Sequence, residues 1–504
     1  MSQIEGRWER IRIVTMGAIA KICTVLVGIG GMLFTLPTFT GNANAQSWLK
    51  LAPTGGPPQL VMYQPAVVLD AATNRLILYG RNTSWQDEVW VLTGANGLSG
   101  TPAWTKLLPS GSPPPNTGNH AAVYDSAHNR MIVFGGCVGG CLPVSNGVWV
   151  LTNANGTGGT PEWISLNPAG ASPSPRHSVA AGYDPATNSM VIFGGHNGGG
   201  WGGSTYSDAW VLSNADGLGG SPVWTQLFPV SGPPPGQYSP SYAYDAASNR
   251  LFVAGGSAQG SGAWTNAVWG LSNATNVATP VWTNLIAEGS PGAPTPFSGP
   301  PAFYDPATNR MMLVMYNAGS YDLWIVNPVA GESPSLAWAW TKLSVNGGPP
   351  SGWSGPNMAV YDPSNNRATV LFGTPSNTLD AWVLSDANGI VNVAIDIKPD
   401  TYPNSINLGS NGTVPVAILG SATFDTTEVD PTTVSLASAQ VKLKGNGTPM
   451  ASITDVNSDG FPDLVVHVST EALTLTDQSV EATLTGQTYD GHSFQGKDNV
   501  KIVP

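Results

Sequence analysis

The stretch SYAYDAASNRLFVAGG, residues 241–256, decides the fold. It joins the dipeptide Tyr-Asp, an Asn-Arg pair four residues after the Asp, and an apolar run that ends in Gly-Gly. Related stretches occur five more times, at intervals of 55 to 61 residues. Self-similarity with such a period is typical of repeat architectures. The aspartates that mark the six copies are Asp70, Asp125, Asp184, Asp245, Asp305 and Asp362.

Each copy predicts four short β-strands, here called a, b, c and d. The Asp-x-x-x-Asn-Arg segment favours a turn between strands a and b, because Asp and Asn side chains satisfy local backbone donors. Ala-Asn-Gly or Ala-Asp-Gly favours a second turn between c and d. Four strands per repeat of this length predict the blades of a β-propeller. A Trp marks strand c of every copy: Trp90, Trp149, Trp210, Trp269, Trp324 and Trp382.

These residues resemble the kelch family, in which strand b closes on Gly-Gly and a spaced Trp follows on strand c. The resemblance covers residues 46–388 and implies an all-β, six-bladed propeller of the galactose-oxidase-like superfamily. Copy 5 has Val314-Met315-Tyr316 where Gly-Gly belongs, and copies 1 and 6 keep one glycine each, Gly80 and Gly373. We expect altered b–c corners in those blades.

The two ends of the repeat array predict how the ring closes. Copy 6 supplies strands a, b and c and then stops without a strand d. Trp48-Leu49-Lys50-Leu51 resembles a strand d that has no a, b and c of its own. Pairing the two completes the sixth blade and leaves no open sheet edge.

Residues 1–45 have the pattern of a secretion signal. Arg7, Arg10 and Arg12 precede an apolar stretch, and Ala43-Asn44-Ala45 is a small-residue cleavage site. The alternative is an uncleaved anchor, since the apolar stretch is long enough to span a bilayer. We therefore expect a secreted or cell-surface protein, with membrane contact only if the segment is retained.

The net charge disfavours one class of partner, and the cysteines disfavour one type of metal chemistry. The net charge of −12 disfavours nucleic acid, which is bound through clustered Lys and Arg. Cys137 and Cys141 are the cysteines outside the signal, and an oxidising compartment favours a local disulfide between them. The copper site of galactose oxidase needs a Cys-modified Tyr, so a Cys137–Cys141 disulfide makes that chemistry doubtful here.

Candidate ligand-binding residues lie in the d–a and b–c loops, which emerge on one face of the ring, here called the loop face. Aromatic and polar groups around a central channel suit stacking on a sugar or gripping a peptide. The alternative is that they pack loops against one another, and for Arg176-His177 a structural role is favoured. The candidates are Tyr63, Trp85, His120, Arg176, His177, His196, Trp201, Tyr206, Tyr238, Trp264, Phe297 and Trp353.

Residues 391–504 predict a separate β-sandwich that resembles a C-terminal module of exported bacterial proteins. Its segment 455–464, DVNSDGFPDL, places oxygen ligands at the spacing of a Ca²⁺ loop, with glycine at the sharp turn. Val466 replaces the usual Glu at position 12, and the alternative is an ion-free Asp/Asn turn. The predicted ligands of this structural Ca²⁺ are Asp455, Asn457, Asp459, the carbonyl of Phe461, and Asp463.

Two functions compete. The first is a non-catalytic, monomeric binding or surface protein that recognises a glycan or a protein with the loop face, with the Ca²⁺ module as an accessory. The second is a carbohydrate-active enzyme, an oxidase or lyase, that uses the same face. The sequence shows no nucleophile constellation or metal triad at the loop positions, which favours binding and predicts no catalytic residue.

Overall fold

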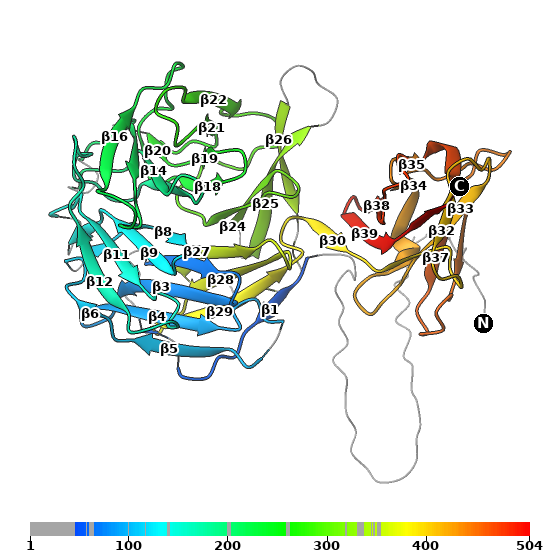
Figure 1. Cartoon of the computed structure of the whole chain (residues 1–504), viewed down its shortest axis with the longest axis horizontal. Helices are drawn as coiled ribbons and strands as arrows, with labels where there is room; N and C mark the ends of the chain where they lie inside the picture. Colours follow the sequence, from blue (N-terminus) through cyan, green and yellow to red (C-terminus); the bar gives the residue numbers. More distant parts are fainter. Residues whose placement is uncertain are drawn as a thin grey trace, which may run out of the picture. The chain divides into compact units, whose positions relative to one another are not determined.

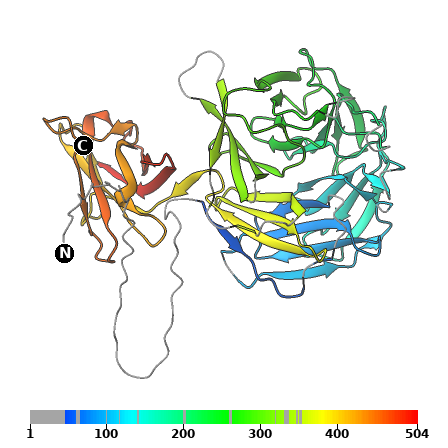
Figure 2. The same ribbon diagram turned by 180° about the vertical axis from the view of Figure 1, so that it is seen from behind.

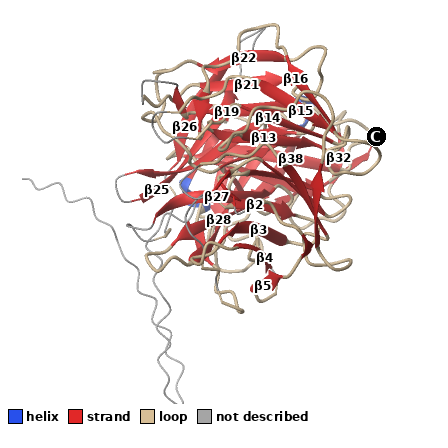
Figure 3. Ribbon diagram, turned by 90° about the vertical axis from the view of Figure 1, so that its left-hand side faces the viewer, coloured by secondary structure: helices blue, strands red, loops and turns tan. Residues whose placement is uncertain are grey.

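The computed structural model describes residues 46–503 except 57, 60–64, 99, 116, 139–141, 199–202, 259–262, 318–319, 330–336, 344, 346–347 and 350–353. Strands dominate it, with short 3₁₀ helices at Thr426–Glu428 and Thr470–Ala472 (Figure 3). The all-β prediction is confirmed. Within the described ranges, no helix is long and apolar enough to cross a membrane. The predicted signal segment lies outside them.

In the described part of residues 48–385, six sheets form the blades, each with four antiparallel strands in the order a, b, c, d, and the sheet of blade 2 has a short fifth strand parallel to its strand d (Figure 1). Blade 1 contains β2 (Ala66–Asp70), β3 (Arg75–Arg81), β4 (Asp87–Thr93) and β5 (Ala103–Leu107). Blade 2 contains β8 (Ala121–Asp125), β9 (Arg130–Phe134), β11 (Val148–Thr152) and β12 (Glu162–Leu166). Blade 3 contains β13 (Ala180–Asp184), β14 (Ser189–Phe193), β15 (Ala209–Ser213) and β16 (Val223–Leu227).

The remaining blades follow the same order. Blade 4 contains β18 (Ser241–Asp245), β19 (Arg250–Ala254), β21 (Val268–Ser272) and β22 (Val281–Ile286). Blade 5 contains β23 (Ala302–Asp305), β24 (Arg310–Asn317), β25 (Ser320–Val329) and β26 (Ala337–Leu343). Blade 6 contains β27 (Ser354–Asp362), β28 (Arg367–Gly373), β29 (Leu379–Ser385) and β1 (Trp48–Lys50). The fifth strand of blade 2 is β6 (Ser110–Gly111), which pairs with β12. In the loops, β7 (Thr117–Gly118) pairs with β10 (Cys137–Val138), and β17 (Gln237–Tyr238) pairs with β20 (Ser257–Ala258).

The a strands line the centre of a closed ring, which Figure 2 shows from behind. Each contacts the a strand of the next blade, and β27 of blade 6 contacts β2 of blade 1. The ring is also closed within blade 6, because β1 pairs antiparallel with β29 in the register Trp48↔Leu384 and Lys50↔Trp382. The pairing predicted from the two ends of the repeat array is confirmed.

Aromatic residues hold neighbouring blades together. The Trp of strand d packs against an aromatic side chain on strand b of the preceding blade, with 5.2 Å between the ring centroids of Phe134 and Trp224 and 4.7 Å between those of Phe193 and Trp282. Both Trp side chains are buried. Burying rings of this size supplies much of the hydrophobic stabilisation of each junction.

The repeated Tyr-Asp-x-x-x-Asn-Arg motif ties blades together on the face opposite the loop face, here called the turn face. In blade 2, the Tyr124 hydroxyl donates to Asn129 at 3.0 Å, and Asn129 has φ 53°, in the left-handed region that Asn tolerates. Arg130 then donates to the main-chain carbonyl of Asp216 in blade 3 at 2.8 Å. The motif therefore has the structural role that its near-invariance indicates.

The Gly-Gly pairs of blades 2, 3 and 4 dock the b–c corner on the next blade. Gly136 donates its N–H to the carbonyl of Arg176 at 3.0 Å, and a Cβ on Gly135 would lie 2.6 Å from that oxygen. Blade 5, which lacks the glycines, instead continues β24 and β25 as a paired hairpin to Asn317↔Ser320. The expected change of corner is confirmed there.

The C-terminal part consists of two sheets and a short strand pair. Val416 and Val466 of one sheet and Leu484 and Phe494 of the other are fully buried in one hydrophobic core. The first sheet contains β30 (Ile390–Asn392), β39 (Ser493–Asn499), β38 (Glu481–Thr488), β34 (Val429–Leu436) and β35 (Ala439–Gln440). The second contains β31 (Ile395–Ile397), β33 (Thr413–Ile418), β37 (Asp463–Ser469) and β36 (Ala451–Thr454), and β32 (Ser405–Asn407) pairs with β40 (Lys501–Val503).

Candidate functional site: the loop face of the propeller

A central pocket of about 200 Å³ opens where the six a strands begin. The described residues that line it include no Asp, Glu, Lys or Arg; prolines, serines and small apolar residues predominate. Asn119, Ser178 and Ser239 occupy equivalent positions at this mouth, each with φ between 52° and 55°. Ser178 donates its N–H to the carbonyl of Asn119 at 2.8 Å, which links blades 3 and 2. The described lining of the pocket is therefore uncharged, and a main-chain hydrogen bond connects neighbouring blades at its mouth.

His120 is the predicted site residue that lines this pocket. Its side chain is 7% exposed, and its ring centroid lies 4.7 Å from that of Tyr79 in blade 1. The imidazole is thus held by packing and faces the pocket with little of its surface.

A second cluster consists of His177, His196 and Tyr238, from the loops of blades 3 and 4. The ring centroids lie 5.4 Å apart for His177 and His196, and 5.1 Å apart for His196 and Tyr238. Burial and the neighbouring His196 lower the pKa of His177 to about 4, and burial lowers that of His196. His196 Nδ1 accepts from the N–H of Gly198 at 3.0 Å. Both imidazoles are therefore neutral near pH 7.

Arg176 is fully buried beneath this cluster. Its Nη2 donates to Asp208 at 3.0 Å, and its guanidinium carbon lies 3.9 Å from the ring centroid of Tyr206. Burial alone would raise the pKa of Asp208, but hydrogen bonds from Arg176 and Trp210 outweigh it and lower that pKa. The charge of Arg176 is thus compensated inside the blade, in keeping with the structural role favoured from the sequence.

Two predicted residues are exposed at the rim of the loop face. Trp85 is 48% exposed, with φ 62° and with the Arg81 guanidinium 5.5 Å from its ring centroid. Trp264 is 49% exposed and lines a groove of about 290 Å³ with Phe297 and Tyr316, here called the rim groove. Phe297 is 5% exposed and belongs mainly to the core between blades 4 and 5.

Sequence reasoning missed Tyr316, which is 49% exposed and lines the rim groove together with Trp264. Tyr316 stands where blade 5 lacks Gly-Gly. An aromatic residue at a corner that other blades reserve for glycine was the available signal.

With the ring and its loop face described, comparison with known proteins identifies the family. The KLHDC2/KLHL20/DRC7 Kelch-repeats domain matches residues 81–299 and residues 143–374, which together cover more than half of the chain. The chain belongs to the kelch-repeat family.

Other similarities to this kelch protein are narrower. Dynein regulatory complex subunit 7 of Chlamydomonas reinhardtii is 34% identical over 93 residues, which are 18% of this chain and 7% of that protein. A solved structure, described as a cryo-EM structure of RAG in complex with one melted RSS and one unmelted RSS, has a TM-score of 0.44 and 11% identity. The match covers 67% of this chain and 99% of that one.

The remaining predicted loop-face residues of the kelch propeller, Tyr63, Trp201 and Trp353, lie outside the described residues. Cys137 is disulfide-bonded, whereas its predicted partner Cys141 lies outside the described residues.

The predicted Ca²⁺ loop connects β36 and β37 in the C-terminal part. Asp455 accepts from the N–H of Gly460 at 3.1 Å, and Asp459 accepts from the N–H of Phe461 at 2.9 Å. Asp463 is fully buried and accepts from the N–H groups of Val456 and Gly420, both at 2.8 Å. Each carboxylate oxygen has a second lone pair, so these bonds leave the oxygens able to accept a cation. The Asn457 side chain donates to Asp459 at 2.9 Å.

Proposed function

We propose that the kelch propeller is a protein-binding platform, that its loop face contacts the partner, and that the bound segment is uncharged. Membership of the kelch-repeat family supports a protein partner. The central pocket supports an uncharged segment, because its described lining has no cationic side chain to pair with a carboxylate or phosphate. Neutral His177 and His196 beside it add no charge.

The observation that carries the proposal is the rim groove. Trp264 and Tyr316 line it and expose about half of their surface, although most other aromatic residues of the repeats are buried or half-buried. Exposed aromatic side chains at a groove are typical anchors of protein interfaces, because they bury much area at little entropic cost. We expect the partner to place an apolar side chain between the two rings.

The test is a selection of peptides from a displayed library on the full chain, followed by affinity measurements. Trp264→Ala and Tyr316→Ala are each expected to weaken the selected peptides about 10- to 100-fold, the usual cost of removing an aromatic anchor. Leu98→Ala is the matched control, because Leu98 is 51% exposed in a c–d turn on the turn face. Equal affinity of all three variants would overturn the proposal.

A glycan is the second candidate, since the same exposed aromatic faces suit stacking on a sugar. A glycan array distinguishes the two candidates: sugar binding lost in Trp264→Ala, without binding of any peptide, would favour the glycan. Turnover of a bound sugar would instead favour the enzymatic alternative.

We also propose that the protein is exported by residues 1–45 and that its C-terminal loop binds Ca²⁺. The disulfide bond of Cys137 supports an oxidising compartment. The oxygen-rich set of Asp455, Asn457, Asp459 and Asp463 supports a hard cation. Calorimetry is expected to show Ca²⁺ binding that Asp459→Ala weakens at least tenfold, whereas an unchanged heat would leave the ion-free turn as the explanation.

A further inference from the structure

A contact on the turn face recurs at four of the six blade junctions. There, the Asp that begins the a–b turn is buried and accepts a hydrogen bond from the c–d turn of the following blade. The donor is a neutral side chain at four junctions: Asn155 to Asp70 at 2.7 Å, Thr275 to Asp184 at 3.0 Å, Asn388 to Asp305 at 2.9 Å, and Asn96 to Asp362 at 2.9 Å.

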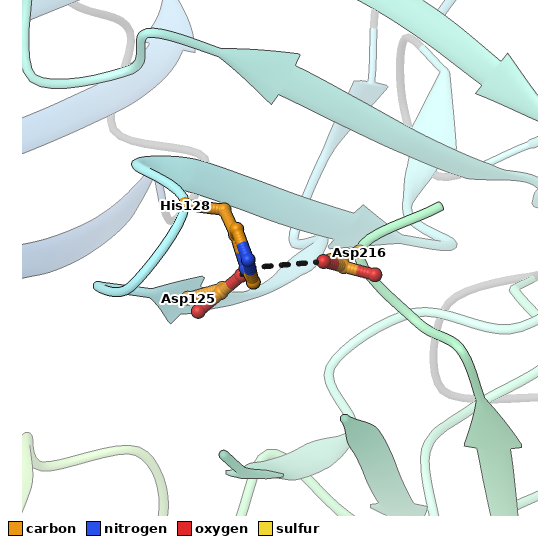
Figure 4. Close-up of side chains that lie close together, drawn as sticks. All are labelled: Asp125, His128 and Asp216. Carbon is orange, nitrogen blue, oxygen red and sulfur yellow. Dashed lines mark hydrogen bonds and ion pairs between the residues drawn. The ribbon is translucent and has the colours of Figure 1, made fainter. Parts of the chain in front are cut away.

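The junction between blades 2 and 3 breaks this rule. The position of the neutral donor is taken by Asp216, so a carboxylate faces the carboxylate of Asp125. A second departure accompanies the first: His128 stands three residues after Asp125, where the other blades have Thr, Ser or Asn. Figure 4 shows the imidazole of His128 between the two carboxylates.

The geometry of the three side chains is close. His128 Nδ1 lies 2.6 Å from Asp125 Oδ2 and 3.5 Å from Asp216 Oδ2, and one ligand atom from each residue falls within a 4.8 Å cluster. Among the described residues, this is the one such cluster of three His, Cys, Asp or Glu side chains.

The surroundings of the Asp216 side chain are a second, independent observation that points to a ligand at this cluster. Its side chain is fully buried, and Oδ1 accepts from the N–H of Leu218 at 2.8 Å and from the Asn188 side chain, whereas Oδ2 has no hydrogen bond beyond its 3.5 Å ion-pair contact with His128. That oxygen is the one aimed at His128 and Asp125. A buried carboxylate oxygen without a donor is costly, and a second buried carboxylate nearby adds repulsion.

We propose that Asp125, His128 and Asp216 bind a divalent transition metal of the Zn²⁺ class, which joins blades 2 and 3. Two carboxylate oxygens and one imidazole nitrogen form a ligand set that Zn²⁺ accepts, whereas Ca²⁺ prefers oxygen ligands throughout. Tetrahedral Zn²⁺ with bonds of about 2.0–2.2 Å separates its ligand atoms by roughly 3.3 Å, between the two distances observed here. The ion would offset the negative charge of the two carboxylates.

Access to the cluster is open on one side. The two carboxylates are buried, but the His128 side chain is 55% exposed. A metal ion can therefore enter from solvent past the imidazole and keep water as its remaining ligand. The rival explanation is that a proton does the same task, with a protonated His128 bridging both carboxylates without any metal.

The experiment is titration of the chelator-treated full chain with Zn²⁺, in excess Ca²⁺ to saturate the C-terminal loop. Asp216→Asn and His128→Thr are the test variants, and each installs a residue that other blades carry at the same position. His492→Gln is the matched control, because His492 pairs with Asp490 at 2.9 Å but belongs to no cluster of three in the described chain.

We expect one Zn²⁺ per chain with an affinity that falls at least roughly 100-fold in both test variants, more than an outer-sphere change costs, and not in the control. Zn²⁺ should also raise the melting temperature of the wild type but not of Asp216→Asn. Wild-type and Asp216→Asn chains with equal Zn²⁺ affinity, or a wild type without a Zn²⁺-dependent rise, would overturn the metal and leave the protonated bridge. A second readout does not depend on Asp216. Zn²⁺ should shift a histidine NMR signal of the wild type, and this shift should be absent from the folded His128→Thr variant.

Discussion

Blades 2, 3 and 4 differ from blades 1, 5 and 6 at the b–c corner, and the difference changes how the main chain of that corner packs. In the first group Gly-Gly breaks strand pairing, and the corner docks on the next blade through its main chain. His177, His196 and Phe297 are buried there. In blades 1 and 5 the strands continue as hairpins, and Trp85 and Tyr316 project into solvent. A glycine pair thus sets how the corner main chain packs, but it does not bury every side chain of the loop, because Trp264 in the b–c loop of blade 4 is half exposed.

The largest expected effect comes from removing β1, which completes hairpin-type blade 6. Deleting residues 46–51 exposes the unpaired edge of β29 and removes buried Leu51. We expect the free energy of unfolding to fall by roughly 3 kcal/mol or more, measured by denaturant unfolding of the propeller transition. A ring that unfolds as before would show that the inner a-strand contacts alone close it.

Asp208→Asn tests the buried Arg176–Asp208 ion pair of blade 3, a Gly-Gly blade. The comparison is the more exposed Lys50–Asp380 pair of blade 6, where the strands continue as a hairpin. The change leaves Arg176, which is fully buried, without a compensating charge, and breaking such a pair costs about 3–5 kcal/mol. Asp380→Asn in blade 6 removes the partner of Lys50, whose side chain is 49% exposed, and is expected to cost at most about 1 kcal/mol. Comparable melting temperatures for the two variants would contradict the contrast.

Gly255→Ala tests the corner itself. Gly255 has φ 65°, and a Cβ there would lie 2.2 Å from the ring of Phe297. Strained backbone and a displaced ring are expected to cost about 2–3 kcal/mol, measured by thermal unfolding. The control is Gly232→Ala, where a Cβ would meet no atom within 4 Å. If both substitutions were equally mild, docking through Gly-Gly would not matter to stability.

The most gradual effect is a pH dependence that arises from the buried histidines. The pKa of His177 is lowered from 6.5 to about 4 in the folded state, so the unfolded chain binds more protons below pH 6.5. The stabilisation that neutral His177 contributes to the folded state is complete above pH 6.5 and is lost as the pH falls toward 4. The free energy of unfolding should fall by at most about 1.4 kcal/mol per pH unit in this range. His177→Gln should flatten this part of the stability profile, and His467→Gln should leave it unchanged.

The fold was predictable from the sequence because the same strand and turn pattern occurs in six copies. The spacing of the repeated motifs and the residues of their turns predict the sheets and the strand order. The single strand at Trp48, which has no a, b and c strands of its own, predicts how the ring closes. The aromatic loop residues were less predictable, because exposure depends on tertiary packing: Trp264 and Phe297 are both loop aromatics beside the Gly-Gly corner of blade 4, yet one is half exposed and the other buried. The Asp125–His128–Asp216 cluster was missed because its members lie in different repeats and meet only across a junction.

The turn-face contacts bear on how blades could be exchanged. Blades 1, 2, 4 and 6 offer a neutral donor at Asn96, Asn155, Thr275 and Asn388, which matches any neighbouring blade that carries the buried Asp. Blade 3 offers Asp216 instead, which here faces Asp125 with His128 between the two carboxylates. A duplicated repeat therefore keeps its junction chemistry where the donor is neutral, whereas a copy of blade 3 placed after a blade without such a histidine brings two buried carboxylates together.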